Sequence, residues 1–259
     1  VLRYLESRFG DYYASYDYDA PLPPIASDRS NKIWMCWWQG LDSAPEIVKA
    51  CVESVRRNAG GREAIIITDK NVSNYVKFPS WIIKKIDAGI ITRTNLSDLL
   101  RLSLLASYGG MWLDSTFYCV GSLDKSLYNG PIFSIKRPDY LHASVAGGMF
   151  AGYSLGCDDD HRRAFATIRD FFLEYWRRND FMVDYLLVDY LTVLAQRHDP
   201  WIAEAFNEIQ PNNPDCDELF KILDQPYDED MWKRLSAHTD LFKLTWKQDF
   251  PVEHDGEKT

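Results

Sequence analysis

The sequence predicts an α/β protein in which a Rossmann-like, mostly parallel sheet is flanked by helices and followed by a helical C-terminal lobe. Two short apolar runs, residues 32–38 and 64–68, have the pattern of strands buried on both faces, and they enclose a helix pattern at 44–58. A strand–helix–strand unit of this kind joins parallel strands through a right-handed crossover. Two long helix patterns, at 162–178 and 183–196, indicate the helical second half.

Size and composition favour one large domain. The chain has 259 residues, of which 46% are hydrophobic and 26% are charged, which are ordinary globular values. Residues 1–30 are rich in Tyr and Asp and end in a proline run, so we expect an arm or short helix and a linker there, followed by a single domain over 31–259. The net charge of −9 argues against a nucleic-acid binder.

The first helix pattern has start and stop signals at both ends. Ser43 stands at the N-cap position of the 44–58 helix, with Glu46 three residues later as in a capping box. Gly60-Gly61 then separates the helix from the second strand.

The strongest later helix runs from residue 95 to 108, because Leu99, Leu102 and Leu105 recur at helical spacing. Gly109-Gly110 ends that helix and turns directly into a strand at 111–113. The remaining expected elements are short helices at 72–76, 81–88, 202–208 and 229–235, and strands at 117–120, 131–135 and 148–151.

Cysteines and apolar runs indicate the compartment. The five cysteines form no C-x-x-C pair and no zinc-ligand spacing, which favours reduced thiols in the cytoplasm. We see no apolar leader at the N-terminus and no run of about 18 apolar residues that would span a membrane. Peripheral contact with the inner face of the plasma membrane could come from residues 176–178 or from the tyrosines of the first segment (Tyr4, Tyr12, Tyr13, Tyr16 and Tyr18).

One segment carries a chemical pattern. Asp98 and Arg101 lie one turn apart on the 95–108 helix and therefore share a face. The strand at 111–113 delivers Asp114 at its carboxyl end, where open α/β sheets bind ligands. An acidic side chain there, with the Thr116 hydroxyl two residues on, is suited to a hard divalent cation bridging a diphosphate.

Each of these residues also has a plain structural explanation. Asp98 could form a capping box with Asn95, and Asp114 could be an ordinary turn residue at a strand end. His238 is more typical of a surface histidine than of a ligand. The acidic run 158–160 is explained by the helix dipole of the helix that follows it, without any bound ion.

The chain resembles the bacterial capsular-polysaccharide synthesis glycosyltransferases, which are related to the DXD-containing sugar transferases and to the glucosylating bacterial toxins. The middle two of the matching stretches, with their fixed Asp98-to-Asp114 spacing, are the specific ones. The stretches are Ile33-Trp34-Met35-Cys36-Trp37-Trp38-Gln39-Gly40, Ser97-Asp98-Leu99-Leu100-Arg101, Tyr108-Gly109-Gly110-Met111-Trp112-Leu113-Asp114-Ser115-Thr116 and Phe242-Lys243-Leu244-Thr245-Trp246-Lys247.

The resemblance implies a GT-A fold and a catalytic group of Asp98, Arg101 and Asp114. Trp38 matches the aromatic residue that stacks on the donor base, and Asp98 and Arg101 match the pair that holds the donor sugar. Asp114 matches the first Asp of the D-x-D motif, with Thr116 at the place of the second.

The same resemblance implies a cofactor and contacts to the diphosphate. Mn²⁺ or Mg²⁺ would be held by Asp114, Thr116 and a tail residue, for which His238 is our choice over Asp240. Lys243 and Lys247 would neutralise the leaving diphosphate.

The implied activity is retaining transfer of a sugar from a nucleotide-sugar donor, with a UDP-sugar favoured. The acceptor would be a growing surface or capsular polysaccharide or a lipid-linked oligosaccharide, and Asp184 or Asp189 could lie on the acceptor side. A nucleotidyltransferase or hydrolase would need a glycine-rich phosphate loop near the first strand, and none is present. The alternative from another class is a catalytically silent sugar- or nucleotide-sugar-binding module, which the replacement of the second Asp by Thr116 keeps open.

Overall fold

A computed structural model describes residues 1–25, 31–139, 144–250, 253–254 and 257–258. Its centre is a five-stranded sheet in the order β2-β1-β3-β6-β5. The strands are β1 (Lys32–Cys36), β2 (Glu63–Ile67), β3 (Gly110–Leu113), β5 (Ile132–Ser134) and β6 (Ser154–Cys157).

The sheet is mixed, and most of its strands run in one direction. β1 pairs with β2 and with β3 in parallel, whereas β6 is antiparallel to both β3 and β5. Four of the five strands therefore share a direction, and the predicted α/β class with a mostly parallel sheet is confirmed. The strand predicted at 148–151 is wrong, because only Ala151 makes a bridge, to Ser154, and the strand itself begins at Ser154.

Side chains alternate across the sheet and form a core on each face. Ile33 and Met35 of β1 pack on one face with Val48 and Val52 of α2 (Glu46–Arg57). Trp34 points to the opposite face, where α4 (Arg93–Tyr108) and α5 (Arg162–Arg178) supply the core. β3 follows the same period-two rule, so Trp112 lies on the α4 face.

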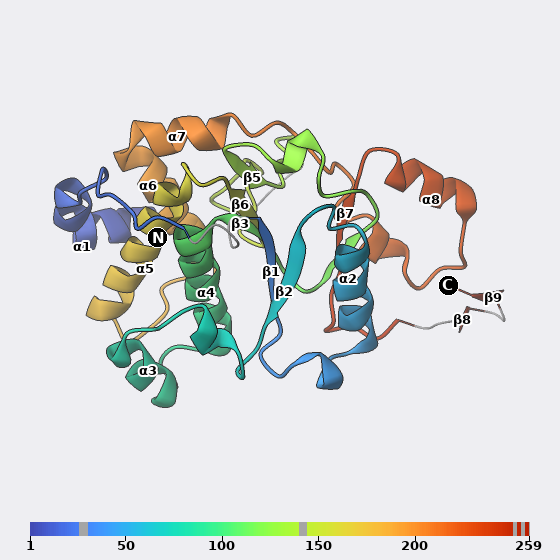
Figure 1. Cartoon of the computed structure of the whole chain (residues 1–259), viewed down its shortest axis with the longest axis horizontal. Helices are drawn as coiled ribbons and strands as arrows, with labels where there is room; N and C mark the ends of the chain where they lie inside the picture. Colours follow the sequence, from blue (N-terminus) through green and yellow to red (C-terminus); the bar gives the residue numbers. More distant parts are fainter. Residues whose placement is uncertain (26–30, 140–143, 251–252, 255–256, 259) are drawn as a thin grey trace.

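Most helices lie on the α4 side of the sheet. Figure 1 shows α4, α5, α6 (Leu187–His198) and α7 (Pro200–Asn207) there, with α2 and α8 (Glu229–Ser236) on the opposite side. The remaining helices are α1 (Leu2–Ser15) and α3 (Ser80–Asp87), with 3₁₀ turns at Leu41–Ser43, Val72–Asn74, Ser126–Tyr128 and Leu219–Ile222. The helical second half predicted from periodicity is confirmed.

The N-terminal segment is a helix that packs on this helical layer. Leu5, Phe9 and Tyr13 of α1 are buried in the same core cluster as α5 and α6. Tyr13 lies 4.4 Å from Phe171 of α5 between ring centroids. The first segment is thus joined to the main core, and the boundary at residue 30 stays a prediction.

Two helix starts differ from the sequence prediction. α2 begins at Glu46 after Pro45, and Ser43 belongs to the 3₁₀ turn before it, so the predicted Ser43 cap is wrong. α4 begins at Arg93 with a capping box between Thr92 and Asn95. Asp98 therefore takes no part in capping, and its side chain has to be explained by the site.

Gly109 and Gly110 make the tight turn from α4 into β3. Their φ angles are +63° and +82°, a region that favours glycine. A Cβ on Gly110 would lie 2.5 Å from the Lys32 carbonyl oxygen of the neighbouring strand. This turn fixes the helix and the strand that carry Asp98, Arg101 and Asp114 against each other.

The tail forms a separate two-stranded sheet in a pairing that the sequence did not reveal. β4 (Phe117–Cys119) pairs antiparallel with β7 (Leu241–Lys243), which sets Phe117 opposite Lys243. A further two-residue pair joins β8 (Glu253–His254) and β9 (Glu257–Lys258). The β4–β7 pair brings residues 243–247 beside the end of β3.

Among the described residues, no helix is both long and apolar enough to cross a bilayer. All five cysteines are free, and four of them are buried. This agrees with the predicted reduced thiols.

Candidate active site

A cleft of about 970 Å³ opens at the carboxyl end of β3, and we call it the β3 cleft. Its lining comes from segments that are distant in the sequence, including the ends of β1 and β3, one face of α4, the start of α6 and the tail after β7. Its charged lining residues are Arg93, Asp98, Arg101, Asp114, Asp189, Lys243 and Lys247. Four cationic groups thus face three carboxyl groups, although the whole chain carries a net charge of −9.

Asp114 lies at the centre of this charge arrangement. Because it follows Trp112 by two residues, its side chain emerges on the α4 face of the sheet. The Trp112 indole Nε1 donates a hydrogen bond to Asp114 Oδ1 over 3.1 Å. The Asp114 carboxylate also lies near two cations: Oδ1 is 3.9 Å from Arg101 and Oδ2 is 3.8 Å from Lys243.

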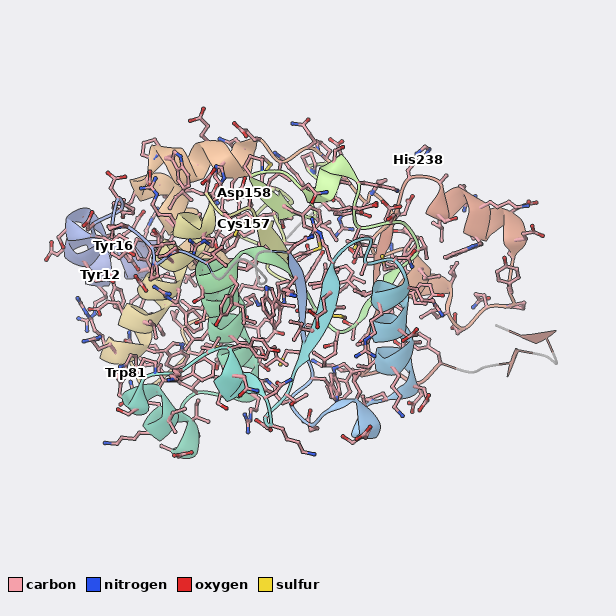
Figure 2. The ribbon with its side chains drawn as sticks, in the orientation of Figure 1. Tyr12, Tyr16, Trp81, Cys157, Asp158 and His238 are labelled. Atoms are coloured by element: carbon pink, nitrogen blue, oxygen red, sulfur yellow. The ribbon has the colours of Figure 1, made fainter. Side chains whose placement is uncertain are left out.

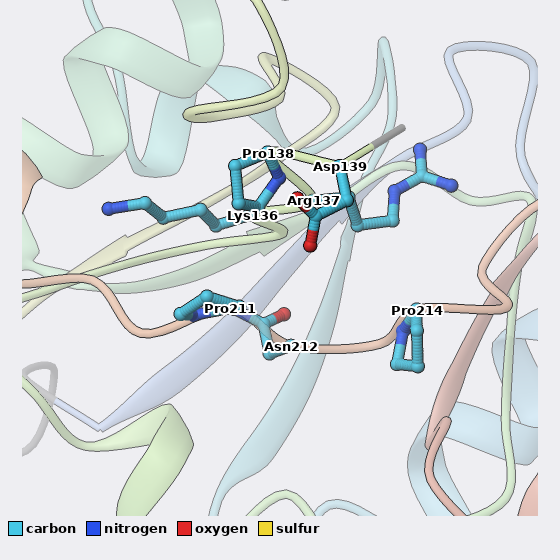
Figure 3. Close-up of a pocket in the computed structure, with 7 residues that line it drawn as sticks. All are labelled: Lys136, Arg137, Pro138, Asp139, Pro211, Asn212 and Pro214. Carbon is cyan, nitrogen blue, oxygen red and sulfur yellow. The ribbon is translucent and has the colours of Figure 1, made fainter. Parts of the chain in front are cut away.

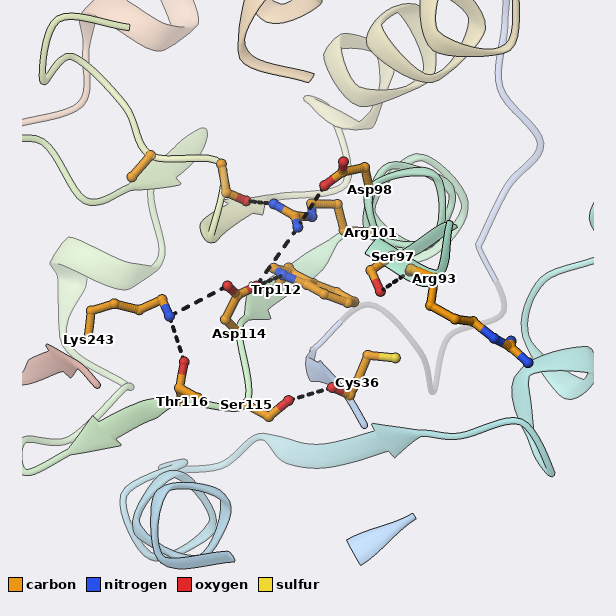
Figure 4. A network of polar contacts seen from close by, with 12 residues as sticks. Cys36, Arg93, Ser97, Asp98, Arg101, Trp112, Asp114, Ser115, Thr116 and Lys243 are labelled. Atoms are coloured by element: carbon orange, nitrogen blue, oxygen red, sulfur yellow. Dashed lines mark hydrogen bonds and ion pairs between the residues drawn. The ribbon is translucent and has the colours of Figure 1, made fainter. Parts of the chain in front are cut away.

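Arg101 connects the helix to the strand end. Its NH2 is 2.9 Å from Asp98 Oδ1, its NH1 donates to the Gly152 carbonyl, and its guanidinium lies over the Trp112 ring (Figure 4). The Arg101 Nε is buried and has no hydrogen-bond partner among the described residues. The three residues predicted to be catalytic, Asp98, Arg101 and Asp114, are therefore brought together.

Burial changes the protonation of two carboxyl groups beside Arg101. The pKa of Asp98 is raised to about 7, chiefly because the group is buried, against the opposing effect of Arg101. Burial also raises the pKa of Asp189 to about 6, again opposed by Arg101. Near neutral pH, part of the carboxyl charge is thus neutralised by protons, and the balance of the β3 cleft shifts further toward positive charge.

Lys243 stands between the two residues predicted to bind metal. Its Nζ donates to Thr116 Oγ1 over 2.6 Å and lies 3.8 Å from Asp114 Oδ2, and Figure 4 shows it reaching both. The antiparallel pairing of β4 with β7 puts it there, because Lys243 is opposite Phe117. The side chain of Lys243 is half-buried.

Several aromatic rings line the β3 cleft, and their exposure differs. Trp38 is only 8% exposed, donates from Nε1 to Ser97 Oγ and has the Arg93 guanidinium over its ring. Trp246 is 47% exposed and packs edge-on against Trp37 at 5.6 Å between centroids. Trp38 lies in the cleft just after β1, as predicted. Its ring has little exposed area, and its contact with a donor base stays a prediction.

His238 does not join the predicted metal-binding residues. It is exposed in the turn after α8, outside the residues that line the β3 cleft (Figure 2). Asp240 is also outside that lining, with both carboxylate oxygens 2.7 Å from Lys125 Nζ. In the part of the chain that the structure describes, no three His, Cys, Asp or Glu side chains form a group that could hold a metal ion. Of the ligands predicted for Mn²⁺ or Mg²⁺, Asp114 and Thr116 both line the β3 cleft, whereas His238 lies outside it.

Of the two carboxyl residues predicted for the acceptor side, only one lines the β3 cleft. Asp189 of α6 lines the β3 cleft, and its Oδ1 would be 2.7 Å from a Cβ placed on Gly152. Asp184 is not in the lining and accepts a hydrogen bond from the Leu186 N–H in the turn before α6. Gly152 is therefore needed where Arg101 and Asp189 approach the backbone.

Other residues that drew attention in the sequence have structural roles. Asp158 accepts from the His161 backbone N–H over 2.9 Å at the start of α5, as the helix-dipole explanation predicts (Figure 2). Trp176 and Tyr13 are fully buried, so the prediction that they could contact a membrane is wrong. Membrane contact by other residues stays a prediction.

A second, smaller pocket of about 350 Å³ lies between residues 136–139 and 211–214 (Figure 3). Its basic groups already have protein partners: Lys136 Nζ donates to the Asn207 carbonyl, and Arg137 pairs with Asp217 over 2.7 Å. This pocket therefore lacks the charge arrangement of the β3 cleft.

Sequence reasoning missed Arg93 and the closeness of Lys243 to Thr116. Arg93 lies in the first turn of α4, pairs with Asp69 and has the sequence context of an ordinary residue on a helix surface. Lys243 was predicted to contact the diphosphate, but only the long-range β4–β7 pairing places it against Thr116, and a three-residue strand has no strong periodic signal.

Comparisons with known proteins identify the family of the chain. A stretch of 115 residues aligns at 27% identity with the "O-glycosyltransferase braB" of Annulohypoxylon truncatum and covers 41% of this chain. The chain spans about a quarter of that protein's length, since the aligned part covers 27% of it. The solved structure "PaToxG Glycosyltransferase" superposes with a TM-score of 0.46 at 14% identity, covering 91% of this chain and 92% of that one. Residues 1–258 match the family described as "Capsular polysaccharide synthesis protein", and the chain belongs to that family.

Proposed function

We propose that this chain is a glycosyltransferase that moves a sugar from a nucleotide-sugar donor, favoured to be a UDP-sugar, to a carbohydrate hydroxyl. The family match over nearly the whole chain and the curated relative named as an O-glycosyltransferase support a transferase role. The observation that carries the proposal is the group of Asp98, Arg101, Asp114 and Lys243 at the carboxyl end of β3.

The charge of the β3 cleft fits an anionic ligand. A nucleoside diphosphate brings negative charge into a chain whose net charge is already −9, so it needs a local excess of cations. Lys243 and Lys247 line the tail side of the cleft, and their positive charge favours a diphosphate there. Arg101, Asp98 and Asp189 lie on the helix side, where sugar hydroxyls could exchange hydrogen bonds with carboxyl groups and a guanidinium.

The chemical step follows from this division. The bond between the anomeric carbon and the diphosphate oxygen breaks, so positive charge develops on the sugar and negative charge on the diphosphate. Preorganised lysines stabilise the departing diphosphate, and the Asp114 carboxylate stabilises the sugar cation. The acceptor oxygen then bonds to the anomeric carbon, and its proton passes to an oxygen of the departing diphosphate.

Retention of configuration belongs to the proposal. If the departing diphosphate accepts the proton, the acceptor must approach from the same face that the diphosphate leaves. No general base from the protein is then needed. The acceptor we propose is a growing surface polysaccharide or a lipid-linked oligosaccharide, entering beside Asp189 and the exposed ring of Tyr185.

Turnover of candidate donors tests the proposal. The purified chain is incubated with UDP-sugars and GDP-sugars and an oligosaccharide acceptor, and released nucleotide is followed by chromatography, with the product anomer assigned by NMR. Asp114→Ala should abolish release with little loss of folding, because a half-buried carboxylate at a strand end is not part of the core. Asp160→Ala, an exposed carboxyl outside the β3 cleft, is the matched control.

Wild-type turnover by Asp114→Ala would show that the site assignment is wrong. Binding of a nucleotide sugar without any release, with every acceptor tried, would instead favour the silent binding module.

A further inference from the structure

The Lys243 ammonium lies between Asp114 and Thr116, the two neighbouring residues predicted to bind a divalent cation. A metal ion held by these two residues would have to coordinate Thr116 Oγ1 as a second ligand. That oxygen already accepts a hydrogen bond from Lys243 Nζ over 2.6 Å. An ammonium and a divalent ion on the same hydroxyl would repel each other strongly at that distance.

Asp114 already has two cationic neighbours. Its two carboxylate oxygens face one cation each, Arg101 at 3.9 Å and Lys243 at 3.8 Å. A divalent ion at this carboxylate would therefore add two positive charges beside two existing ones. Among the described residues, no three His, Cys, Asp or Glu side chains, Asp114 included, form a group that could hold a metal ion.

Lys243 is held in place from several sides, as a fixed part of the site must be. Its backbone N–H donates to the Cys216 carbonyl over 2.8 Å, and its residue pairs with Phe117 in the β4–β7 ladder. Its ammonium lies 5.9 Å from the Phe117 ring centroid and 5.7 Å from that of Tyr153. Moving the ammonium to admit an ion would break its hydrogen bond to Thr116 and its contacts with these two rings, whereas the backbone contacts would remain.

The ammonium still has capacity for a ligand. It has three N–H donors, of which Thr116 Oγ1 and the Leu244 carbonyl take two. Its side chain is 22% exposed and lines the β3 cleft. The third donor and the positive charge are therefore available to a diphosphate oxygen.

From these contacts we infer that the chain binds the diphosphate of its donor without a divalent metal ion, with Lys243 as the fixed cation in the metal's place. This inference rests on the proposed function, because it concerns the same donor site. It predicts that Lys243 is a binding and catalytic residue, and that Thr116 serves to hold the lysine.

Metal-stripped protein provides the test. The chain is treated with EDTA, and the affinities for UDP and GDP are measured by equilibrium dialysis in EDTA and in Mn²⁺, while the EPR signal of free Mn²⁺ reports whether the ion binds. We expect one nucleotide to bind equally well in both buffers and the free-ion signal to stay unchanged. Tenfold or greater dependence of the affinity on Mn²⁺ in the wild-type chain would overturn the inference and leave the proposed function standing.

Variants separate the lysine's charge from its bulk. Lys243→Met removes the charge and keeps the alkyl chain, and it should weaken nucleotide binding in EDTA by about 10- to 100-fold, as for the loss of a hydrogen bond from a charged group. Lys243→Arg should restore part of the affinity. Lys125→Met, outside the β3 cleft, is the matched control and should bind like the wild type.

A double variant tests the replacement in the opposite direction. Thr116→Asp with Lys243→Met supplies a second carboxylate and removes the ammonium, so it should bind Mn²⁺ in the EPR experiment where the wild type does not. Unchanged nucleotide affinity in folded Lys243→Met would refute the role of the lysine. Absence of UDP and GDP binding in every buffer would contradict both this inference and the proposed function.

Discussion

At the residue scale, the site depends on one guanidinium shared among carboxyl groups. Arg101 pairs with Asp98 at 2.9 Å, lies 3.9 Å from Asp114 and lowers the pKa of Asp189 against the effect of burial. A lysine could not reproduce these contacts, because the guanidinium uses separate N–H groups to pair with Asp98 and to donate to the Gly152 carbonyl. Arg101 therefore holds the carboxyl groups at fixed positions around the proposed sugar site.

Replacement of Arg101 should mainly affect turnover. Arg101→Ala should lower kcat/KM for nucleotide-sugar turnover by about 100-fold, on the order of 3 kcal/mol, as for the loss of other charge-stabilising donors. Arg101→Lys keeps the positive charge but lacks the two-pronged guanidinium, so its kcat/KM should lie between those of Arg101→Ala and the wild type. Steady-state kinetics checks this, and a wild-type kcat/KM in Arg101→Ala would remove the residue from the site.

The buried carboxyl of Asp98 predicts a pH dependence of stability. Its pKa is raised to about 7 in the folded chain, against about 3.9 when unfolded. Between pH 4 and 7 the folded state keeps a proton that the unfolded state has lost, so the free energy of unfolding should fall as the pH rises.

Asp98→Asn should flatten this pH dependence by on the order of 3 kcal/mol between pH 4 and 7. Urea unfolding at a series of pH values measures it. Asp189→Asn should act in the same direction over a narrower window, because the pKa of Asp189 is raised only to about 6. The exposed Asp160→Asn is the control, and equal slopes for wild type and Asp98→Asn would contradict the burial argument.

At the scale of elements, patterns with a strong period were predictable and long-range pairings were not. The bounds predicted for the helix at 162–178 are those of α5, because its apolar periodicity and the residues that flank it indicate the same ends. The short strand β7 and its pairing with β4 depend on residues more than 120 positions apart, and a three-residue segment carries no period of its own. That pairing places Lys243 in the β3 cleft, so this part of the site could not be predicted from the neighbouring sequence alone.

The same division applies to the predicted residues of the site. Asp98, Arg101 and Asp114 were predictable because a helical turn and a strand end bring them together through local geometry. His238 was chosen by its place in the tail, and the turn after α8 carries it to the surface instead. Local sequence determined the helix–strand part of the site, and the fold determined the part from the tail.

The first helix offers a test of how closely the N-terminal segment is tied to the core. Phe9 is 1% exposed and lies 5.8 Å from Tyr175 of α5 between ring centroids. Phe9→Ala should therefore lower the free energy of unfolding by about 3–5 kcal/mol, as for other buried aromatic deletions. Arg8→Ala on the exposed side of α1 is the matched control, and urea unfolding measures both. Equal stability of Phe9→Ala and wild type would show that α1 is a separable arm.

At the scale of the whole molecule, the β3 cleft joins segments from both halves of the chain. Its lining includes residues before position 40, the α4–β3 unit, the start of α6 and the tail to Lys247. A ligand in the cleft therefore stabilises the fold as one unit. If UDP binds as we propose, at 100 times its dissociation constant it should add about 2.7 kcal/mol to the free energy of unfolding.

This stabilisation should appear as a rise in Tm of about 5–10 °C in calorimetric scans, with a single transition. CMP, which lacks the diphosphate, should give a smaller shift at the same concentration. Two separate transitions, with only one of them shifted by UDP, would contradict the single cooperative unit.

The central claim is that the β3 cleft is the nucleotide-sugar site, and hydrogen–deuterium exchange with and without UDP tests it most directly. We predict slower exchange on UDP binding in segments 36–39, 114–116 and 243–247, and unchanged exchange in segments 136–139 and 211–214 around the second pocket. Protection at the second pocket, or UDP binding that leaves the three cleft segments unchanged, would contradict the account.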